Sequence, residues 1–231
     1  MTRAPRSDAR ANRAGILEAA RQTLAEDPRA SIDAIARGAG LSRRTLYGHF
    51  DDREALIREL IAAGAQRFNA IADSVADEDA RLALARLAAR LWHEAAHVQF
   101  AAALALDDIH VAQTAEALAP LRRTVAGLVR RGQDDGLFRA DIAAATLARL
   151  VEEVARTVVA RTDASSPDAA SLAVRTLLSV AGLSWREADA LLREHPDVLA
   201  EPATVGGDGS GASTADSDSP ALSGTGQEGR A

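Results

Sequence analysis

The segment from Ser42 to Phe50 (SRRTLYGHF) carries side chains that could contact a DNA duplex. In a helix, Leu46 and Phe50 would share the inward face, while Arg43 and Tyr47 would share another face beside Arg44. Arginine pairs with phosphate oxygens and guanine edges, and hydroxyl groups bond to phosphates. We therefore expect the outward side chains to contact bases or the DNA backbone. The candidates on this helix are Ser42, Arg43, Arg44, Thr45, Tyr47 and His49.

A second chemical pattern, His93-Glu94-Ala95-Ala96-His97, matches the HExxH motif of zinc enzymes. In that motif two histidines one helical turn apart bind the metal, and the glutamate activates water. No third histidine follows at the spacing that some of these enzymes use. The motif leaves three interpretations open: a zinc hydrolase, a helical face that lines a ligand site or senses a metal, and an ordinary exposed or packed face.

The remaining C-terminal part is rich in alanine and leucine, so its few large or titratable side chains stand out. Such groups often orient a small molecule in an apolar pocket, although aromatic side chains also fill ordinary cores. The candidate ligand-binding residues are Trp92, His93, His97, Phe100, His110 and Phe138. The sequence does not identify the small molecule.

Two short helices joined by a tight turn must position the arginine face. Ile32 and Ile35 give the preceding helix one apolar side, and the Gly38-Ala39-Gly40 cluster allows the chain to turn sharply. The Ser42 hydroxyl can cap the second helix. A supporting first helix is expected from about Asn12 to Ala25.

A long fourth helix is expected to follow these helices and to run towards Ser74. Asp51 would be its N-cap, and Glu54 would reach back to complete a capping box. Arg53 lies at the start of this helix, where arginine charge and helix dipole both favour an anion.

These elements resemble the N-terminal domain of the tetracycline-repressor-like (TetR) family of bacterial transcription regulators. The fragments that carry the resemblance are RAGILEAA (13–20), Ile35-Ala36, AGLS (39–42), TLY (45–47), His49-Phe50 and REAL (53–56). Arg44 stands where the family more often has a small residue, and Arg53 where it commonly has a phosphate-contacting lysine. The resemblance implies a ligand-responsive regulator, a repressor that binds a pseudo-palindromic double-stranded DNA operator as a homodimer.

Apolar residues at helical spacing predict the helices of the C-terminal part. The predicted spans are 79–106, 115–131, one that includes 147–158 and one that includes 172–180. Gly136 is expected to end the second helix, Asp141 to cap the third, and Ser184 with Glu187 to form a capping box for a short last helix. By the resemblance, the last two long helices form a four-helix bundle with those of a second copy.

Composition predicts an all-α protein, since 47% of the residues are hydrophobic and strong helix formers dominate. The expected organisation is a flexible arm (1–11), a helix-turn-helix domain (12–57), a helical effector-binding and dimerisation domain (58–198) and a disordered tail (199–231). The chain contains no cysteine, and the longest apolar run is too short to cross a membrane. We therefore expect a cytoplasmic regulator without cofactor, bound metal, catalytic residues or membrane contact.

The formal net charge of −6 is unevenly distributed along the chain. Residues 1–50 carry nine arginines against five acidic residues, whereas the remainder carries 18 against 28. A duplex would therefore attract the N-terminal part and repel the rest, which would orient the approach to DNA.

Overall fold

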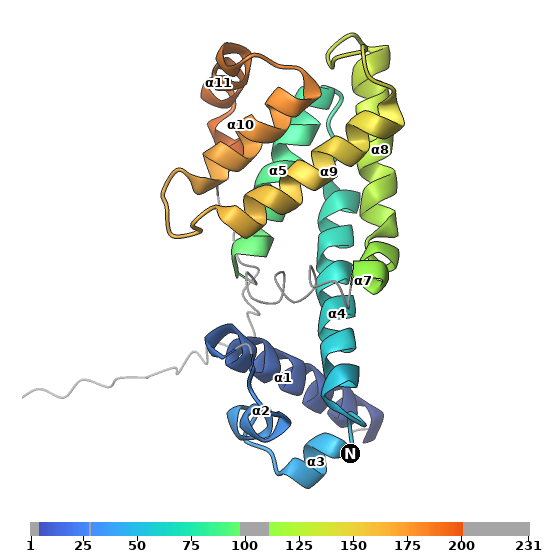
Figure 1. The fold of residues 1–231 in the computed structure, drawn as a ribbon, viewed down its shortest axis with the longest axis vertical. Coiled ribbons are helices and arrows are strands. Elements are labelled where there is room, and N and C mark those ends of the chain that lie inside the picture. Colours follow the sequence, from blue (N-terminus) through green and yellow to red (C-terminus); the bar gives the residue numbers. More distant parts are fainter. Residues whose placement is uncertain (1–4, 28, 98–110, 201–231) are drawn as a thin grey trace, which may run out of the picture. The chain divides into compact units, whose positions relative to one another are not determined.

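The computed structural model describes residues 5–27, 29–97 and 111–200, and these residues fold into helices without any strand, as the composition predicts (Figure 1). The helices are α1 (Pro5–Glu26), α2 (Ile32–Gly38), α3 (Arg43–Tyr47), α4 (Arg53–Ser74), α5 (Ala80–His97), α7 (Val111–Ala117), α8 (Ala119–Asp134), α9 (Ala144–Arg161), α10 (Ala169–Ala181) and α11 (Trp185–Glu194), followed by the 3₁₀ turn η1 (Pro196–Leu199). None of the described helices is long and apolar enough to span a membrane.

The N-terminal domain consists of α1, α2, α3 and the first turns of α4, which pack around a small apolar core. Its fully buried side chains come from all four helices. They include Ile16, Leu24, Ile35, Leu46 and Leu56. Burial of one such side chain contributes roughly 1.5–3 kcal/mol, so this core stabilises helices that are too short to persist alone.

The turn between α2 and α3 depends on glycine. Gly40 has φ +66°, which L-residues with a Cβ rarely adopt, and its N–H donates to the Arg37 carbonyl at 3.0 Å. Gly38 lies so close to α1 that a Cβ there would come within 2.6 Å of the Thr23 Oγ1 atom. The two positions therefore allow the sharp turn and the close packing of α2 on α1.

Two predicted helix starts in this part are wrong. α1 begins at Pro5 rather than at Asn12, so most of the predicted flexible arm is helical; proline is well suited to a first helical turn because that turn needs no N–H donor. The N-cap of α4 is Asp52 rather than Asp51, and its carboxylate accepts from the Ala55 N–H at 2.6 Å. Adjacent aspartates make the two caps indistinguishable by sequence.

The C-terminal domain is built around α5, which packs against α4, α8, α9 and α10. Figure 1 shows α9 and α10 crossing α5, and α8 running alongside α4. Its core is dominated by leucine, valine and alanine, with Leu84, Leu147 and Leu178 almost fully buried. The predicted capping box of α11 is confirmed, because Ser184 and Glu187 each accept from the backbone N–H of the other.

Other predicted boundaries in this domain need correction. The helix predicted over 115–131 is split into α7 and α8, because Pro120 lies in the first turn of α8 and cannot donate to the preceding turn. Gly136 adopts φ +69° just beyond α8, which confirms the predicted helix end. Asp141 does not cap α9, which starts at Ala144; its carboxylate accepts from the Arg139 guanidinium instead. The predicted continuation of α5 to Leu106 lies outside the described residues.

Candidate nucleic-acid interface and internal cavity

The α3 face comprises Arg43, Arg44, Thr45 and Tyr47, which are exposed, while the opposite side of the helix is buried. Leu46 is 0% exposed and Phe50 is 2% exposed, which confirms their predicted place in the core. Ser42 caps the helix as predicted: its Oγ accepts from the Thr45 N–H at 3.1 Å. The same hydroxyl lies 2.8 Å from the Thr45 Oγ1 atom, so the two hydroxyls are held together at the helix start.

Arg43 is held on the α3 face by two neighbours. Its Nη1 donates to Asp33 Oδ2 at 3.0 Å, and its guanidinium carbon lies 5.5 Å from the centre of the Tyr47 ring. Interaction with Tyr47, and then with Asp33, raises the pKa of Arg43. The Arg43 side chain is 64% exposed, so its ion pair with Asp33 is weak. Another anion could therefore replace Asp33 as the partner of Arg43.

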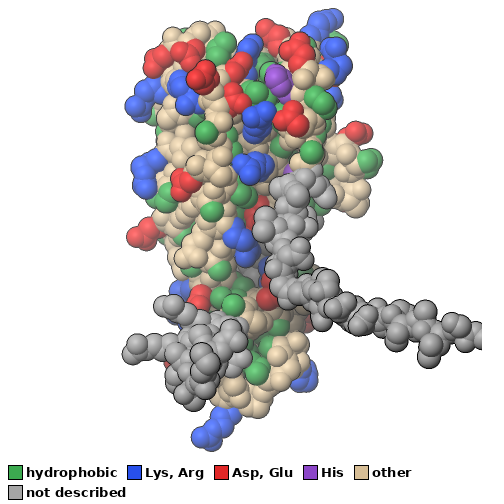
Figure 2. Space-filling model, turned by 180° about the vertical axis from the view of Figure 1, so that it is seen from behind, with side chains coloured by type: hydrophobic (Ala, Val, Ile, Leu, Met, Phe, Trp, Pro, Cys, Tyr) green, Lys and Arg blue, Asp and Glu red, His purple; other side chains and the backbone are tan. Residues whose placement is uncertain are grey.

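Arg44 is the free cation of the α3 face: its exposed side chain forms no hydrogen bond or ion pair with any described residue. Figure 2 shows arginine side chains projecting from the end of the molecule that α2 and α3 form, whereas both signs of charge are mixed over the C-terminal domain. This end is therefore suited to an anionic surface.

His49 and Arg53, two other predicted DNA contacts, are half-buried and already bonded within the domain. The His49 carbonyl accepts from Arg13 Nη1 at 2.9 Å, and Arg53 Nε donates to the Ala30 carbonyl at 3.3 Å. These bonds fix the loops around α3. A contact of either residue with DNA stays a prediction.

Arg13 is a positioning residue that the sequence did not single out. Its guanidinium lies 4.5 Å from the centre of the Phe50 ring, bonds the His49 carbonyl, and forms an ion pair with Glu59 on α4. It thereby ties α1 to the end of the α3 segment and to α4. Its partners are distant in the chain, so no local spacing indicated this role.

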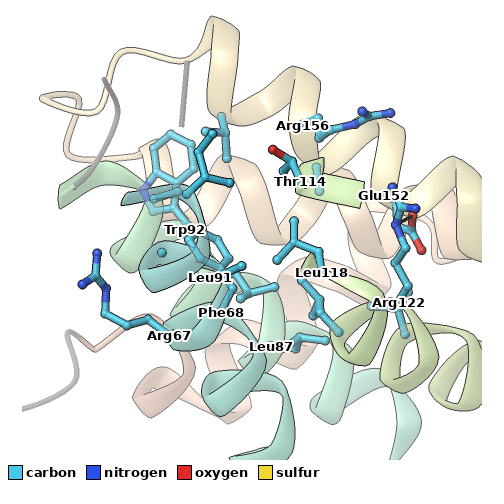
Figure 3. Close-up of a pocket in the computed structure, with 18 of the residues that line it drawn as sticks. Arg67, Phe68, Leu87, Leu91, Trp92, Thr114, Leu118, Arg122, Glu152 and Arg156 are labelled. Atoms are coloured by element: carbon cyan, nitrogen blue, oxygen red, sulfur yellow. Dashed lines mark ion pairs between the residues drawn. The ribbon is translucent and has the colours of Figure 1, made fainter. Parts of the chain in front are cut away.

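A cavity of about 390 Å³ lies among α1, α4, α5, α7, α8, α9 and α10, within the size range of small-molecule sites. Its wall is mainly aliphatic and aromatic, and Figure 3 shows Phe68, Leu87, Leu91, Trp92 and Leu118 around it. Polar side chains occur at its edges. They are Glu18, Arg21, Arg67, Thr114, Arg122, Glu152 and Arg156.

The predicted ligand-binding residues divide between this cavity and other places. Trp92 lines the cavity and is 5% exposed. His93 is half-buried and does not line it. Phe138 is a core residue packed closely on Gly132, where a Cβ would come within 2.2 Å of the ring. The His97 side chain, Phe100 and His110 lie outside what the structure describes.

Most of the cavity wall was missed by sequence reasoning. Phe68 and Leu91 belong to apolar stripes that resemble those of any core helix. Arg67 and Arg122 resemble ordinary surface arginines. Only the packing of seven helices reveals that these residues line a cavity.

One edge of the cavity carries a group of charges that joins three helices. Arg67 on α4 donates to Glu94 on α5 at 2.5 Å, while Arg21 and Glu18 pair on α1. The Arg21 hydrogen bond lowers the pKa of Glu18, and the positive charge of Arg67 acts in the same direction. All four side chains therefore form one alternating cluster of charge.

The opposite edge carries Glu152 on α9, which faces Arg122 on α8 at 3.2 Å (Figure 3). Burial raises the pKa of Glu152, and the charge of Arg122 opposes that shift only in part. The Glu152 carboxylate is thus poorly solvated and disfavours a second negative charge beside it.

The HExxH glutamate, Glu94, is engaged in the ion pair with Arg67. Among the described residues, no three histidine or acidic side chains come together in a way that could hold a metal ion. The zinc-hydrolase interpretation therefore gains no support from the part of α5 that is described.

The N-terminal domain matches a known family of DNA-binding proteins. Residues 16–60 match the model of the family described as bacterial regulatory proteins, tetR family. No curated protein is significantly similar in sequence to the chain.

Solved structures share the fold at low sequence identity. The TetR family transcriptional regulator PfmR from Thermus thermophilus is 21% identical over 73% of this chain and 98% of its own, with a TM-score of 0.61. The transcriptional regulator FadR from Bacillus subtilis, in complex with stearoyl-CoA, is 16% identical over 73% and 97%, with a TM-score of 0.62. RolR in complex with resorcinol is 17% identical over 85% and 96%, with a TM-score of 0.56.

Proposed function

We propose that this chain, whose N-terminal domain and fold are those of TetR-family DNA-binding transcriptional regulators, is a ligand-responsive repressor that acts as a homodimer in the cytoplasm. The observation that carries the proposal is the pairing of an exposed cationic α3 face with a cavity in the same compact unit. The first binds the operator, and the second binds the effector.

DNA binding rests on the α3 face. Arg43 and Arg44 contact base edges or phosphates in the major groove, and Thr45 and Tyr47 add hydroxyl contacts. The Arg43–Asp33 pair is exposed and exchanges for a DNA contact. Two N-terminal domains of a dimer would reach successive major grooves, about 34–36 Å apart.

Dimerisation is supported by apolar side chains that α9 and α10 expose to solvent. Leu150 of α9 is 41% exposed and Leu172, in the first turn of α10, is 51% exposed. Because exposed apolar groups are stabilised by burial, we infer that these helices pack against the same helices of a second copy.

Effector binding is supported by the size and apolar lining of the cavity. The relatives crystallised with stearoyl-CoA and with resorcinol show that proteins of this fold hold small molecules. The identity of the effector does not follow from that likeness, since these relatives are only 16% and 17% identical to the chain.

Coupling between the two sites is supported by α4 and α1, which contribute to both the N-terminal core and the cavity wall. Leu56 of α4 belongs to the N-terminal core, while Leu60 and Phe68 of the same helix line the cavity. Leu17 of α1 also lines it. A ligand that moves α4 would change the separation of the two α3 faces and oppose DNA binding, with a coupling of roughly 1–3 kcal/mol.

The decisive experiment has two steps. Genome-wide mapping of DNA bound by the full chain should give a pseudo-palindromic site, and the neighbouring genes would indicate candidate effectors. Operator affinity is then measured with and without each compound that binds the chain. Saturation with a bound compound that leaves operator affinity unchanged would contradict ligand-responsive repression, while asymmetric sites would contradict the dimer.

A further inference from the structure

We propose that the cavity takes an amphipathic anion, an apolar molecule that ends in a carboxylate, and that this carboxylate replaces Glu94 as the partner of Arg67. The inference rests on the proposed effector role of the cavity and specifies the class of molecule bound. It assigns Arg67 as the residue that recognises the charged end.

The charge of the lining favours an anion. Four arginines line the cavity, namely Arg21, Arg67, Arg122 and Arg156, against two glutamates, Glu18 and Glu152. All four arginines are ion-paired, and the lining has an excess of positive groups because the partners of Arg67 and Arg156, namely Glu94 and Glu153, lie outside it. Since the rest of the lining is aliphatic and aromatic, one negative group on an apolar molecule matches both features.

The two edges of the cavity differ in how they would receive a carboxylate. At the α8–α9 edge, Glu152 itself lines the cavity, and burial raises its pKa, so a second carboxylate there would be repelled. At the α1–α4–α5 edge, Glu18 also lines the cavity, but Arg21 pairs with it and lowers its pKa. The partner of Arg67 at this edge is Glu94, which lies outside the lining. Arg67 therefore lines the cavity, whereas its counter-ion does not.

The surroundings of Arg67 suit the junction between a charged end and an apolar chain. Figure 3 shows Arg67 at one side of the cavity, near Phe68 and Trp92, with the leucine wall between it and Arg122. Its side chain is 47% exposed, so it can turn between Glu94 and a ligand without being stripped of water. A bidentate pair between guanidinium and carboxylate is among the strongest charged hydrogen-bond arrangements.

Occupancy would alter an ion pair on α4, the helix that the two domains share. The Arg67–Glu94 pair joins α4 to α5, and the charges of these residues act on Glu18 and Arg21 of α1. A ligand carboxylate on Arg67 releases Glu94 and changes the balance of charge around Arg21. The bound anion thereby acts on the two helices that connect the cavity with the N-terminal domain.

The test uses the purified full chain and straight-chain carboxylates from hexanoate to tetradecanoate, each compared by isothermal titration calorimetry with the alcohol of the same length. We expect at least one carboxylate to bind about tenfold more tightly than its alcohol. Arg67→Gln should remove that difference and leave alcohol binding unchanged, whereas Arg67→Lys should retain part of it. Glu94→Gln should tighten carboxylate binding several-fold, because it removes the competitor of the ligand.

The matched control is Arg90→Gln, which removes an arginine on α5 that bonds the Ser74 hydroxyl and does not line the cavity. Carboxylate binding by this variant should equal that of the unaltered chain, and thermal unfolding of every variant checks the fold. Equal affinity for carboxylate and alcohol, absence of binding by the whole series, or equal losses for both in Arg67→Gln would overturn the inference. Operator mapping is independent of these probes, so such a result would leave the regulator proposal standing.

Discussion

The N-terminal and C-terminal domains have the same apolar helical spacing, but it produces a closed core in one and a cavity in the other. In the N-terminal domain, the stripes of α1 to α4 meet in a closed core, and the chemistry lies on the outward α3 face. In the C-terminal domain, comparable stripes leave a cavity that part of α1 also lines, and the chemistry lies on its inner wall. The comparison teaches that a small helical unit can be filled by its own side chains, whereas a larger set of helices can leave space for a small molecule.

The largest expected effect tests this contrast by removing one leucine from each domain. Leu46→Ala should lower the free energy of unfolding by about 2–5 kcal/mol, since Leu46 is 0% exposed and the closed core cannot fill the void. Leu91→Ala should cost clearly less, because Leu91 already borders the cavity. Urea denaturation measures both, and equal costs would show that the two domains are equally well packed.

The second effect concerns the outward chemistry of the N-terminal domain. Arg43→Ala and Arg44→Ala should each weaken operator binding by about 1–3 kcal/mol at a base-reading position, without a matching loss of stability. Fluorescence anisotropy with the mapped operator and with base-substituted duplexes distinguishes base reading from phosphate contact. Arg90→Gln provides a comparison variant on the C-terminal domain, and unchanged binding by an Arg43/Arg44/Tyr47 triple alanine variant would reject the α3 face as the DNA contact.

A smaller effect should arise from the intramolecular partner of Arg43. Asp33→Asn removes the anion that holds Arg43 at 3.0 Å and reduces the negative charge near DNA. Operator affinity should rise by about 0.2–1 kcal/mol, the usual worth of an exposed ion pair. Fluorescence anisotropy again measures operator affinity. Repeating it at several salt concentrations shows whether the gain comes from stronger electrostatic attraction between the variant and DNA. Weaker binding would mean that Asp33 orients Arg43 for DNA rather than competing with it.

The smallest effect is a dependence of stability on pH in the C-terminal domain. Burial raises the pKa of Glu152, so its contribution favours folding at low pH and is lost as the pH rises through that raised pKa. Glu152→Gln should therefore be slightly more stable than the unaltered chain at neutral pH, and the difference should shrink as the pH falls through the glutamate range. Urea midpoints at several pH values test this, and a difference that grows on acidification would contradict the sign.

Sequence reasoning was most accurate where structure is determined by neighbouring residues. The caps at Ser42 and Ser184, the burial of Leu46 and Phe50, and the helix end at Gly136 all depend on contacts within a few positions. The errors at Asn12, Asp51 and Asp141 are boundary errors, in which more than one residue could begin a helix.

The cavity could be predicted only in part, because it is a property of packing between distant segments. Trp92 was identified by its size, but Phe68 and Arg67 of the same wall carry no local signal. Phe138 has the same kind of side chain as a ligand contact, yet close packing on Gly132 makes it a core residue. Residue type thus indicates which side chains can bind a molecule, and tertiary contacts determine which ones border a cavity.

The ion pair between Arg13 and Glu59 bears on protein engineering. A chimera joined at the predicted boundary, residue 57, would separate Arg13 from its own Glu59. It would also remove Leu60 from the N-terminal core on which it packs. A junction after residue 60, where the family match also ends, would transplant the domain with these contacts intact. The exchangeable unit of DNA specificity therefore includes the first two turns of α4.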